Sequence, residues 1–310
     1  MSPIDWFVML FTVVGLALYG LWTARHHQSV NDYMRGGKNL KWGTIGLSVM
    51  ATQASAITFL SIPGQGYETG LSFVQNYLGL PIAIIIISAF FIPMYYRLGV
   101  ITAYEFLGQR FDQKTRLLGA GLFLVQRGLA AGITIYAPAI IVSSVLHWPL
   151  GPTILLSGVL VILYTVAGGT RTVSLTQKYQ MLVILFGMMI AFGFILHGLS
   201  NHVSLGNALH LAGLYDRLET ISFSTDPGKR YTIWTGLIGG TFLSLSYFGT
   251  DQSQVQRYLV GRSTSAIRAG LLFNAILKIP MQFAILLLGV LLFVFYHFHL
   301  PPIFFNEAAI

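Results

Sequence analysis

The sequence contains no cysteine and little charge. None of its 310 residues is a cysteine, which excludes disulfide bonds and thiolate metal sites within it. Only 9% of the residues are charged, whereas soluble domains carry about 25%. The 10 acidic residues are scattered through predicted loops, and no glycine-rich phosphate loop is present. We therefore expect neither an enzyme nor an organic cofactor, and no obligate protein partner is evident.

Long apolar runs are what the sequence has instead. Hydrophobic residues make up 55% of the chain, and the mean hydropathy is +0.70. A helix needs about 20 apolar residues to cross the hydrocarbon core of a bilayer. The runs predict an all-α polytopic membrane protein with spans at residues 5–24, 43–66, 72–96, 117–146, 152–168, 177–198, 232–250 and 269–299. The first run begins with Asp5 and lacks a basic leader, so we predict a retained span rather than a signal peptide.

The basic residues gather on one side of the predicted membrane. If the N-terminus is outside, 13 of the 18 lysines and arginines lie in the inner segments, and the outer segments hold only Arg217, Lys229 and Arg230. An excess of basic residues marks cytoplasmic loops. The net charge of +8 thus predicts a multi-pass protein of the cell (plasma or inner) membrane with an outer N-terminus. The partner it implies is the lipid bilayer and not a nucleic acid.

The second predicted span is rich in polar residues and helix breakers. Residues 51–67 read ATQASAITFLSIPGQGY. Unwound backbone is tolerated inside a membrane only where it lines a cavity or is buried in protein. We predict that the helix breaks here and that the break is a binding site. The alternative is that the hydroxyls bond to their own helix and Pro63 merely ends it.

The seventh predicted span also looks interrupted, because residues 234–250 contain Gly239, Gly240, Ser244, Ser246 and Gly249. It lies five spans after the second and therefore runs in the opposite direction. Paired broken helices in two inverted halves indicate the midplane site of a secondary transporter. The chain would then be one incomplete transmembrane domain, residues 1–310, with a first five-helix repeat at about 43–198 and the start of a second at about 232–299.

Four motifs resemble the sodium:solute symporter family in order along the chain. They are ATQASAITFLSIPGQGY, GVITAYEFLGQRFDQKTR, YTVAGGTRTVSLTQKYQ and DQSQVQRYLVGRS. The resemblance implies a leucine-transporter-type inverted repeat with one extra N-terminal helix, truncated here after about eight helices. It also implies that inward flow of Na⁺, the coupling ion, drives uptake of a small polar or anionic solute by alternating access. Family members carry sugars, acidic sugars, carboxylates and vitamins.

The resemblance also implies site residues. A Na⁺ site would use the backbone carbonyls of Ala51 and Ala54, with its other ligands on a later helix that this sequence does not include. The implied substrate contacts are Gln53, Ser55, Thr58, Gln75 or Asn76, Ser244, Tyr247 and Lys278. Many members have Trp-Thr-Asp where this chain has Leu175-Thr176-Gln177. The missing carboxylate favours one Na⁺ per cycle, although Thr176 could still offer an oxygen to the ion path.

Two basic residues fall deep within predicted spans. Arg127 lies eleven residues beyond Arg116, which is roughly 16 Å along a helix. Lys278 lies ten residues beyond Arg268, which is roughly 15 Å along a helix. Intramembrane cations indicate functional sites, unless the side chains snorkel to the surface. An anionic substrate would explain both. Asp251 is expected to pair with a nearby arginine or to help form an inner gate.

We therefore predict sodium-coupled symport of a small solute. Two alternatives remain open on the sequence. The chain could be the membrane-embedded solute sensor of a larger signalling protein, or a truncated carrier that is inactive because half of its sodium ligands are missing.

Overall fold

The computed structural model describes residues 40–54, 56–99 and 102–300, together with positions 7, 11, 14, 15 and 18. Within the helices it leaves out the side chains at positions 56, 57, 60, 145, 164, 165, 167–172 and 175. Apart from the five isolated positions, the first predicted span lies outside these ranges. Ser55, one of the predicted substrate contacts, also lies outside the described residues.

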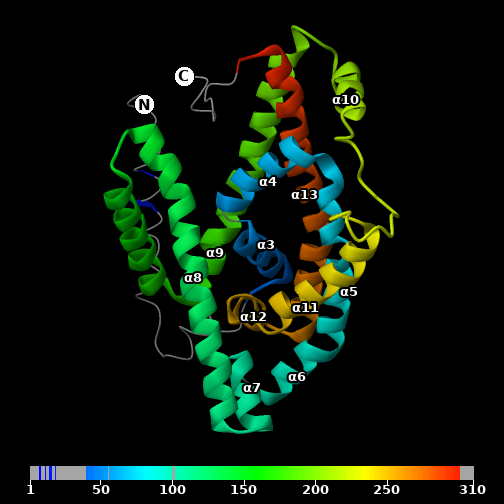
Figure 1. Ribbon diagram of the computed structural model, residues 1–310. Coiled ribbons are helices and arrows are strands. Elements are labelled where there is room, and N and C mark those ends of the chain that lie inside the picture. The colour runs from blue at the N-terminus through cyan, green and yellow to red at the C-terminus, as the bar shows by residue number, and fades with distance from the viewer. Residues whose placement is uncertain are drawn as a thin grey trace. The chain divides into compact units, whose positions relative to one another are not determined.

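The described chain is almost entirely helical, which confirms the all-α prediction (Figure 1). The elements are α3 (Trp42–Gln53), α4 (Ala56–Thr69), η2 (Gly70–Tyr77), α5 (Gly79–Ile86), η3 (Ile87–Phe91), α6 (Ile92–Leu98), α7 (Ala103–Arg110), α8 (Gln113–Leu146), α9 (Leu150–Ser200), α10 (Leu205–Leu214), η4 (Thr235–Gly239), α11 (Gly240–Gly249), α12 (Gln252–Leu259) and α13 (Thr264–Phe298). A 3₁₀ segment (η2) and two π-helical segments (η3 and η4) lie among the α-helices.

The chain divides into two compact units. Unit 1 comprises Met1–Ile57, Pro81–Met181 and Leu243–Ala275, and unit 2 comprises Thr58–Leu80, Leu182–Phe242 and Ile276–Ile310. Several helices, α13 among them, contribute to both units. The contacts below are described within each unit.

Four helical stretches in the described ranges are long and apolar enough to cross a membrane, by length and composition. They are Ser61–Leu98, Gln113–Ser144, Thr176–Ser200 and Thr264–Phe298, and Leu150–Leu163 is a shorter apolar helix. One expectation needs correction. The fifth and sixth predicted spans are not separated by a non-helical connection, because α9 is helical over all 51 residues of Leu150–Ser200. At 1.5 Å per residue this helix is roughly 77 Å long, more than two hydrocarbon cores of about 30 Å.

The predicted break in the second span is present, between α3 and α4. Ala54 leaves the helical conformation with φ −90° and ψ 65°, and its N–H folds back to the carbonyls of Met50 and Ala51. The alternative that Pro63 ends the helix is wrong, because α4 includes Pro63 and continues to Thr69. The chain therefore breaks before its prolines and glycines, at the centre of the hydroxyl-rich stretch.

The second break lies at the end of the predicted interrupted stretch, beside Gly249, and not at its glycine pair. Gly239 and Gly240 sit where the π-helical η4 passes into α11, without an interruption. The helix stops at Gly249, and α12 begins at Gln252 after a non-helical Thr250 and Asp251. Gly240 serves close packing in unit 2, since its added Cβ would lie 2.5 Å from the carbonyl oxygen of Asn76, whereas a Cβ on Gly239 would meet no atom within 4 Å.

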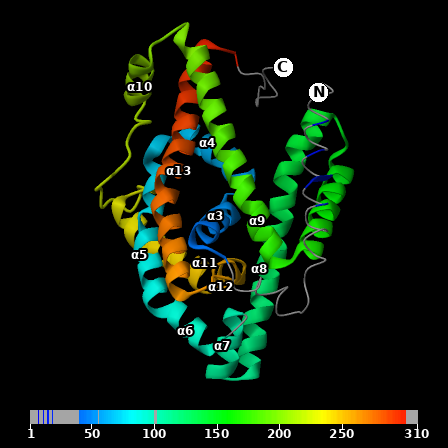
Figure 2. The same ribbon diagram turned by 180° about the vertical axis from the view of Figure 1, so that it is seen from behind.

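The two discontinuous helices are adjacent at one end within unit 1. Leu40, just before α3, forms a parallel bridge with Gly261, just after α12. Helices α3 and α12 are also in contact, and Figure 2 shows them as neighbours.

Small residues let the helices of unit 2 approach closely. A Cβ on Gly289 of α13 would overlap the carbonyl of Pro63, and one on Gly66 of α4 would overlap the carbonyl of Leu286. Membrane helices rely on such small residues for packing, because lipid provides no hydrophobic driving force between them. The contact places the middle of α4 directly on α13.

We expect Gly289→Ala to destabilise the folded protein by about 1–3 kcal/mol, the usual cost of overpacking. Gly193→Ala on α9 is the matched control, since no atom lies within 4 Å of its added Cβ. The measurement is thermal unfolding of the purified complete protein in detergent. A melting temperature equally unchanged in both variants would contradict the close α4–α13 contact.

Candidate functional site

Polar side chains from α3 and α9 meet near the end of α3, in unit 1. The Gln177 side-chain oxygen accepts hydrogen bonds from the hydroxyls of Ser48, at 2.9 Å, and Thr52, at 3.3 Å. Ser48 is fully buried. The neutral amide that replaces the family's aspartate thus holds α3 against α9. The sequence drew attention to the missing carboxylate but not to this contact.

The predicted substrate residue Gln53 lies on the last turn of α3. Its amide nitrogen is 3.3 Å from the carbonyl oxygen of Val49 and 3.5 Å from the side-chain oxygen of Asn274 on α13. Asn274 is fully buried, and its amide nitrogen has no hydrogen-bond partner among the described residues. The end of α3 therefore faces the buried amide of Asn274, whose nitrogen can still donate a hydrogen bond to a ligand.

The carbonyl groups at this break suit a hard monovalent cation. Ala51 and Ala54 lie at the C-terminal end of α3, where the helix dipole is negative. The Ala51 carbonyl accepts from the N–H of Ala54 at 3.1 Å, which uses one of the two lone pairs of its oxygen. Thr176, the possible further oxygen, is buried, and its hydroxyl donates to the carbonyl of Val173 at 3.0 Å. In the part of the chain that the structure describes, no group of histidine or acidic side chains could hold a metal ion. Backbone oxygen is thus the main ligand on offer.

The second break carries a charged cluster, also in unit 1. Arg127 of α8 forms an ion pair with Asp251 and donates to the Ser253 hydroxyl at 2.6 Å. This confirms the predicted pairing of Asp251 with an arginine. The guanidinium also lies 5.9 Å from the ring centroid of Tyr247, whose hydroxyl accepts from Gln254 at 2.8 Å. Arg127 is therefore engaged by protein groups.

In unit 2, Gln75 is fully buried and bonded to backbone. Its nitrogen donates to the carbonyls of Ser72, at 3.1 Å, and Tyr231, at 3.3 Å, and its oxygen accepts from the N–H of Ser222 at 2.9 Å. The amide thus ties the outer loop to η2. Of the two alternatives for the substrate contact, Asn76 is the one whose amide is not used in this way.

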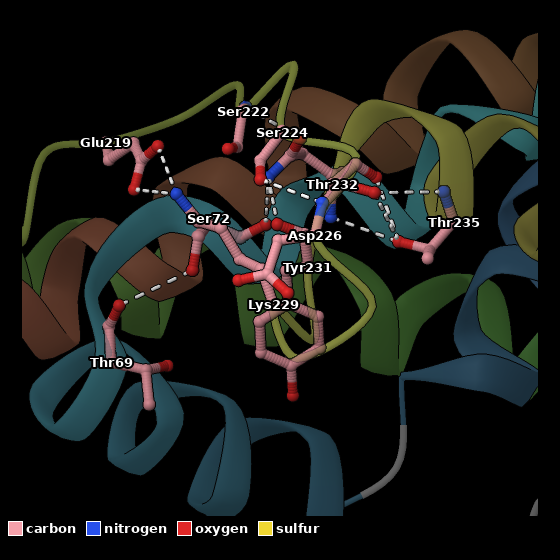
Figure 3. A network of polar contacts seen from close by, with 11 residues as sticks. Thr69, Ser72, Glu219, Ser222, Ser224, Asp226, Lys229, Tyr231, Thr232 and Thr235 are labelled. Carbon is pink, nitrogen blue, oxygen red and sulfur yellow. Dashed lines mark hydrogen bonds and ion pairs between the residues drawn. The ribbon is translucent and has the colours of Figure 1, made fainter.

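The outer loop is further ordered by its own polar contacts (Figure 3). Lys229 reaches both carboxylate oxygens of Glu219, at 2.8 and 3.0 Å. This hydrogen bond holds the pKa of Glu219 below its usual range. The Thr235 hydroxyl accepts from the N–H of Thr232 at 3.0 Å and so fixes the start of the following helix.

Lys278 of α13 is a buried cation in unit 2. Its side chain is 2% exposed, and no carboxylate of the described chain lies within ion-pair distance of it. The ammonium is 5.8 Å from the ring centroid of Tyr77. One helical turn further on, Gln282 is fully buried. Burying an unpaired charge is costly, so Lys278 is a candidate ligand-binding residue.

The predicted site residues divide between the two units. Unit 1 holds Ala51, Gln53, Ala54, Arg127, Thr176, Ser244, Tyr247 and Asp251. Unit 2 holds Thr58, Gln75, Asn76 and Lys278. Sequence reasoning missed Gln177, Asn274 and Gln282. The sequence did contain a signal for Asn274 and Gln282. Together with Lys278 they form a series of polar residues spaced four apart in an otherwise apolar helix.

Two discontinuous helices whose ends are lined by carbonyl, hydroxyl and amide groups define a membrane carrier. A profile described as the sodium:solute symporter family matches residues 33–307. The chain belongs to this family.

Named relatives and a solved structure agree with this assignment. The human sodium/iodide cotransporter is 34% identical over 291 residues, which cover 93% of this chain and 44% of the relative. Human sodium-coupled monocarboxylate transporter 2 is 29% identical over 86% of this chain and 43% of its own length. The structure of a Na⁺-coupled sialic acid symporter in a substrate-bound outward-open state has a TM-score of 0.86 at 27% identity, covering 98% of this chain and 63% of that one. This chain thus spans less than half the length of these curated relatives.

We expect Gln75→Leu to release the outer loop, because buried groups of Ser222 and Tyr231 lose their partners at about 1–3 kcal/mol each. Faster tryptic cleavage at Lys229 and Arg230 of the purified complete protein would report this release. Gln65→Leu is the control, since Gln65 bonds only the exposed Thr69 hydroxyl among side chains. Equal cleavage rates in the two variants would contradict the structural role of Gln75.

Proposed function

We propose that the complete protein is a sodium-coupled symporter that carries a small anion across the cell membrane by alternating access. The observation that carries the proposal is the break at Ala54, where the negative end of α3 meets the start of α4. Carbonyls at the end of a half-helix suit Na⁺, while the positive N-terminal end of the next half-helix suits an anionic group. The named relatives are carriers of iodide, monocarboxylates and sialic acid, which supports transport over sensing.

In this proposal Na⁺ binds at the carbonyls of Ala51 and Ala54 and stabilises the outward-open state. Substrate then binds, the carrier occludes, and both ligands leave on the inner side. Coupling requires that each ligand bind the two states unequally. One Na⁺ per cycle is supported by Gln177, because the carboxylate that would attract a second cation is replaced by an amide whose oxygen is engaged by Ser48 and Thr52.

The remaining Na⁺ ligands that the family resemblance implies lie on a later helix, in the part of the relatives that this chain does not cover. The orientation with the N-terminus outside rests on the distribution of basic residues. The predicted substrate contacts at Gln53, Thr58, Asn76, Ser244 and Tyr247 are part of the same proposal.

We expect uptake by the complete protein in proteoliposomes to require Na⁺. Replacing Na⁺ by K⁺ or choline at constant ionic strength and clamped membrane potential should abolish uptake, because the larger cations do not fit a site built for Na⁺. The initial rate should rise hyperbolically with Na⁺ concentration, as for a single coupling ion. Undiminished uptake in K⁺ would end the proposal of sodium coupling.

The substrate class is proposed from Lys278, whose buried ammonium lacks a counterion among the described residues. Polar cavities that hold an intramembrane cation mark substrate or ion paths. An anion would provide the missing charge and could also accept from the buried amide of Gln282. A neutral sugar would leave the ammonium uncompensated.

We expect Lys278→Gln to weaken uptake of anions by about 10- to 100-fold, the usual worth of one charged hydrogen bond. Iodide, lactate and N-acetylneuraminate are suitable probes, with glucose as the neutral comparison. Lys114→Gln on the exposed start of α8 is the control. Since removing an unpaired buried charge does not weaken packing, the unliganded variant should melt no lower than the parent. Unchanged anion uptake, or a clear loss of stability, would assign Lys278 a structural role instead.

A further inference from the structure

The second helix break is fastened to three other helices of unit 1. The Tyr95 hydroxyl on α6 donates to the carbonyl of Gly249 at 2.7 Å, and the N–H of Ala103 on α7 donates to the Gln252 side chain at 3.0 Å. Arg127 on α8 provides the third fastening. The contacts made by Tyr95 and Ala103 are hydrogen bonds between neutral groups. The contact made by Arg127 is an ion pair with Asp251.

Asp251 serves the break in two ways at once. One carboxylate oxygen caps α12 by accepting from the N–H of Ser253, at 2.9 Å, and from its hydroxyl, at 2.7 Å. The other oxygen forms the ion pair with Arg127, which also reaches the Ser253 hydroxyl at 2.6 Å. The start of α12 and the attachment of the break to α8 therefore depend on the same carboxylate.

Tyr247 is held from two sides by this arrangement. The Arg127 guanidinium lies over its ring, and the Gln254 amide donates to its hydroxyl. Tyr247 is on the last turns of α11, before the break, and Gln254 is on the first turn of α12, after it. The tyrosine thus bridges both parts of the discontinuous helix, and its position depends on how they are joined.

We propose that Arg127 is a positioning residue whose pair with Asp251 latches the α11–α12 break to α8 and holds Tyr247 in place. The latch opens when the carrier releases substrate on the inner side. It rests on the proposed function, in which Tyr247 is a substrate contact. The Arg127 side chain is 32% exposed while Asp251 is 8% exposed. Arg127 is thus the less enclosed partner, and this ion pair can separate without removing a buried side chain from its packing, which makes it the contact suited to open reversibly.

The first test measures opening of the break without any transport. Val255 on α12 is fully buried, and this chain has no cysteine, so Val255→Cys introduces a single buried reporter here. Any cysteines elsewhere in the complete protein are first replaced. We expect Arg127→Gln and Asp251→Asn each to speed labelling by a maleimide reagent about tenfold, since one charged contact is lost. Asp251→Asn is informative because asparagine caps a helix as well as aspartate does, so only the charge is removed.

Two further variants complete this test. Lys114→Gln removes a charge from the exposed start of the same helix and should leave labelling unchanged. The double variant Arg127→Asp with Asp251→Arg should return labelling toward the parent rate. Labelling that is unchanged in both single variants, or equally faster in Lys114→Gln, would overturn the latch.

The second test asks whether the latch positions Tyr247 for transport. Uptake of iodide, lactate or N-acetylneuraminate by Arg127→Gln should show a KM raised about tenfold, with a maximal rate per folded molecule that changes much less. A purely structural role would instead lower the amount of folded protein and leave KM unchanged, which would overturn the positioning role. If the parent protein transports none of the probes in Na⁺ but labelling still accelerates, the proposed function fails and the latch stands.

Discussion

A membrane helix can be interrupted only where groups other than lipid satisfy its backbone, and both interruptions in this chain meet that constraint in their own way. At Ala54 the first unpaired N–H turns back to the carbonyls of Met50 and Ala51. At the second break the carboxylate of Asp251 takes the N–H of Ser253. The carbonyls at the end of α3 can accept a further partner, because each carbonyl oxygen has two lone pairs. In the proposed function, Na⁺ is that partner.

Close packing is needed to keep the half-helices in place. Lipid is as apolar as the helix surfaces and therefore provides no hydrophobic driving force for their association. Glycine provides this closeness at Gly66 and Gly289 in unit 2 and at Gly46 and Gly270 in unit 1. A glycine in these helices can therefore mark a close contact instead of a break. Gly240 is such a case, since its added Cβ would lie 2.5 Å from the carbonyl oxygen of Asn76.

The sequence predicted the helical class, the first break and the pairing of two discontinuous helices, because these depend on local composition and spacing. It did not locate the second break within residues 234–250, since a capping Asp251 followed by polar Gln252 looks the same at the start of a loop as at the start of a half-helix. Nor could it assign Gln75, whose partners Ser222 and Tyr231 are 147 and 156 residues away. Amide side chains can bond to any polar group that the fold brings near, and the spacing of residues in the sequence does not reveal these partners.

Arg127 and Lys278 show how the same residue class at a similar predicted depth acquires different roles. The arginine meets Asp251, so its charge is already balanced and is available only to hold the protein together. The lysine has no carboxylate partner in the described chain, and in the proposed function the bound anion balances its charge. The proposed carrier takes up two opposite charges, Na⁺ at neutral carbonyls and an anion at an ammonium. Thermodynamic coupling between two ligands means that the binding of one changes the affinity for the other, and by the same factor in both directions.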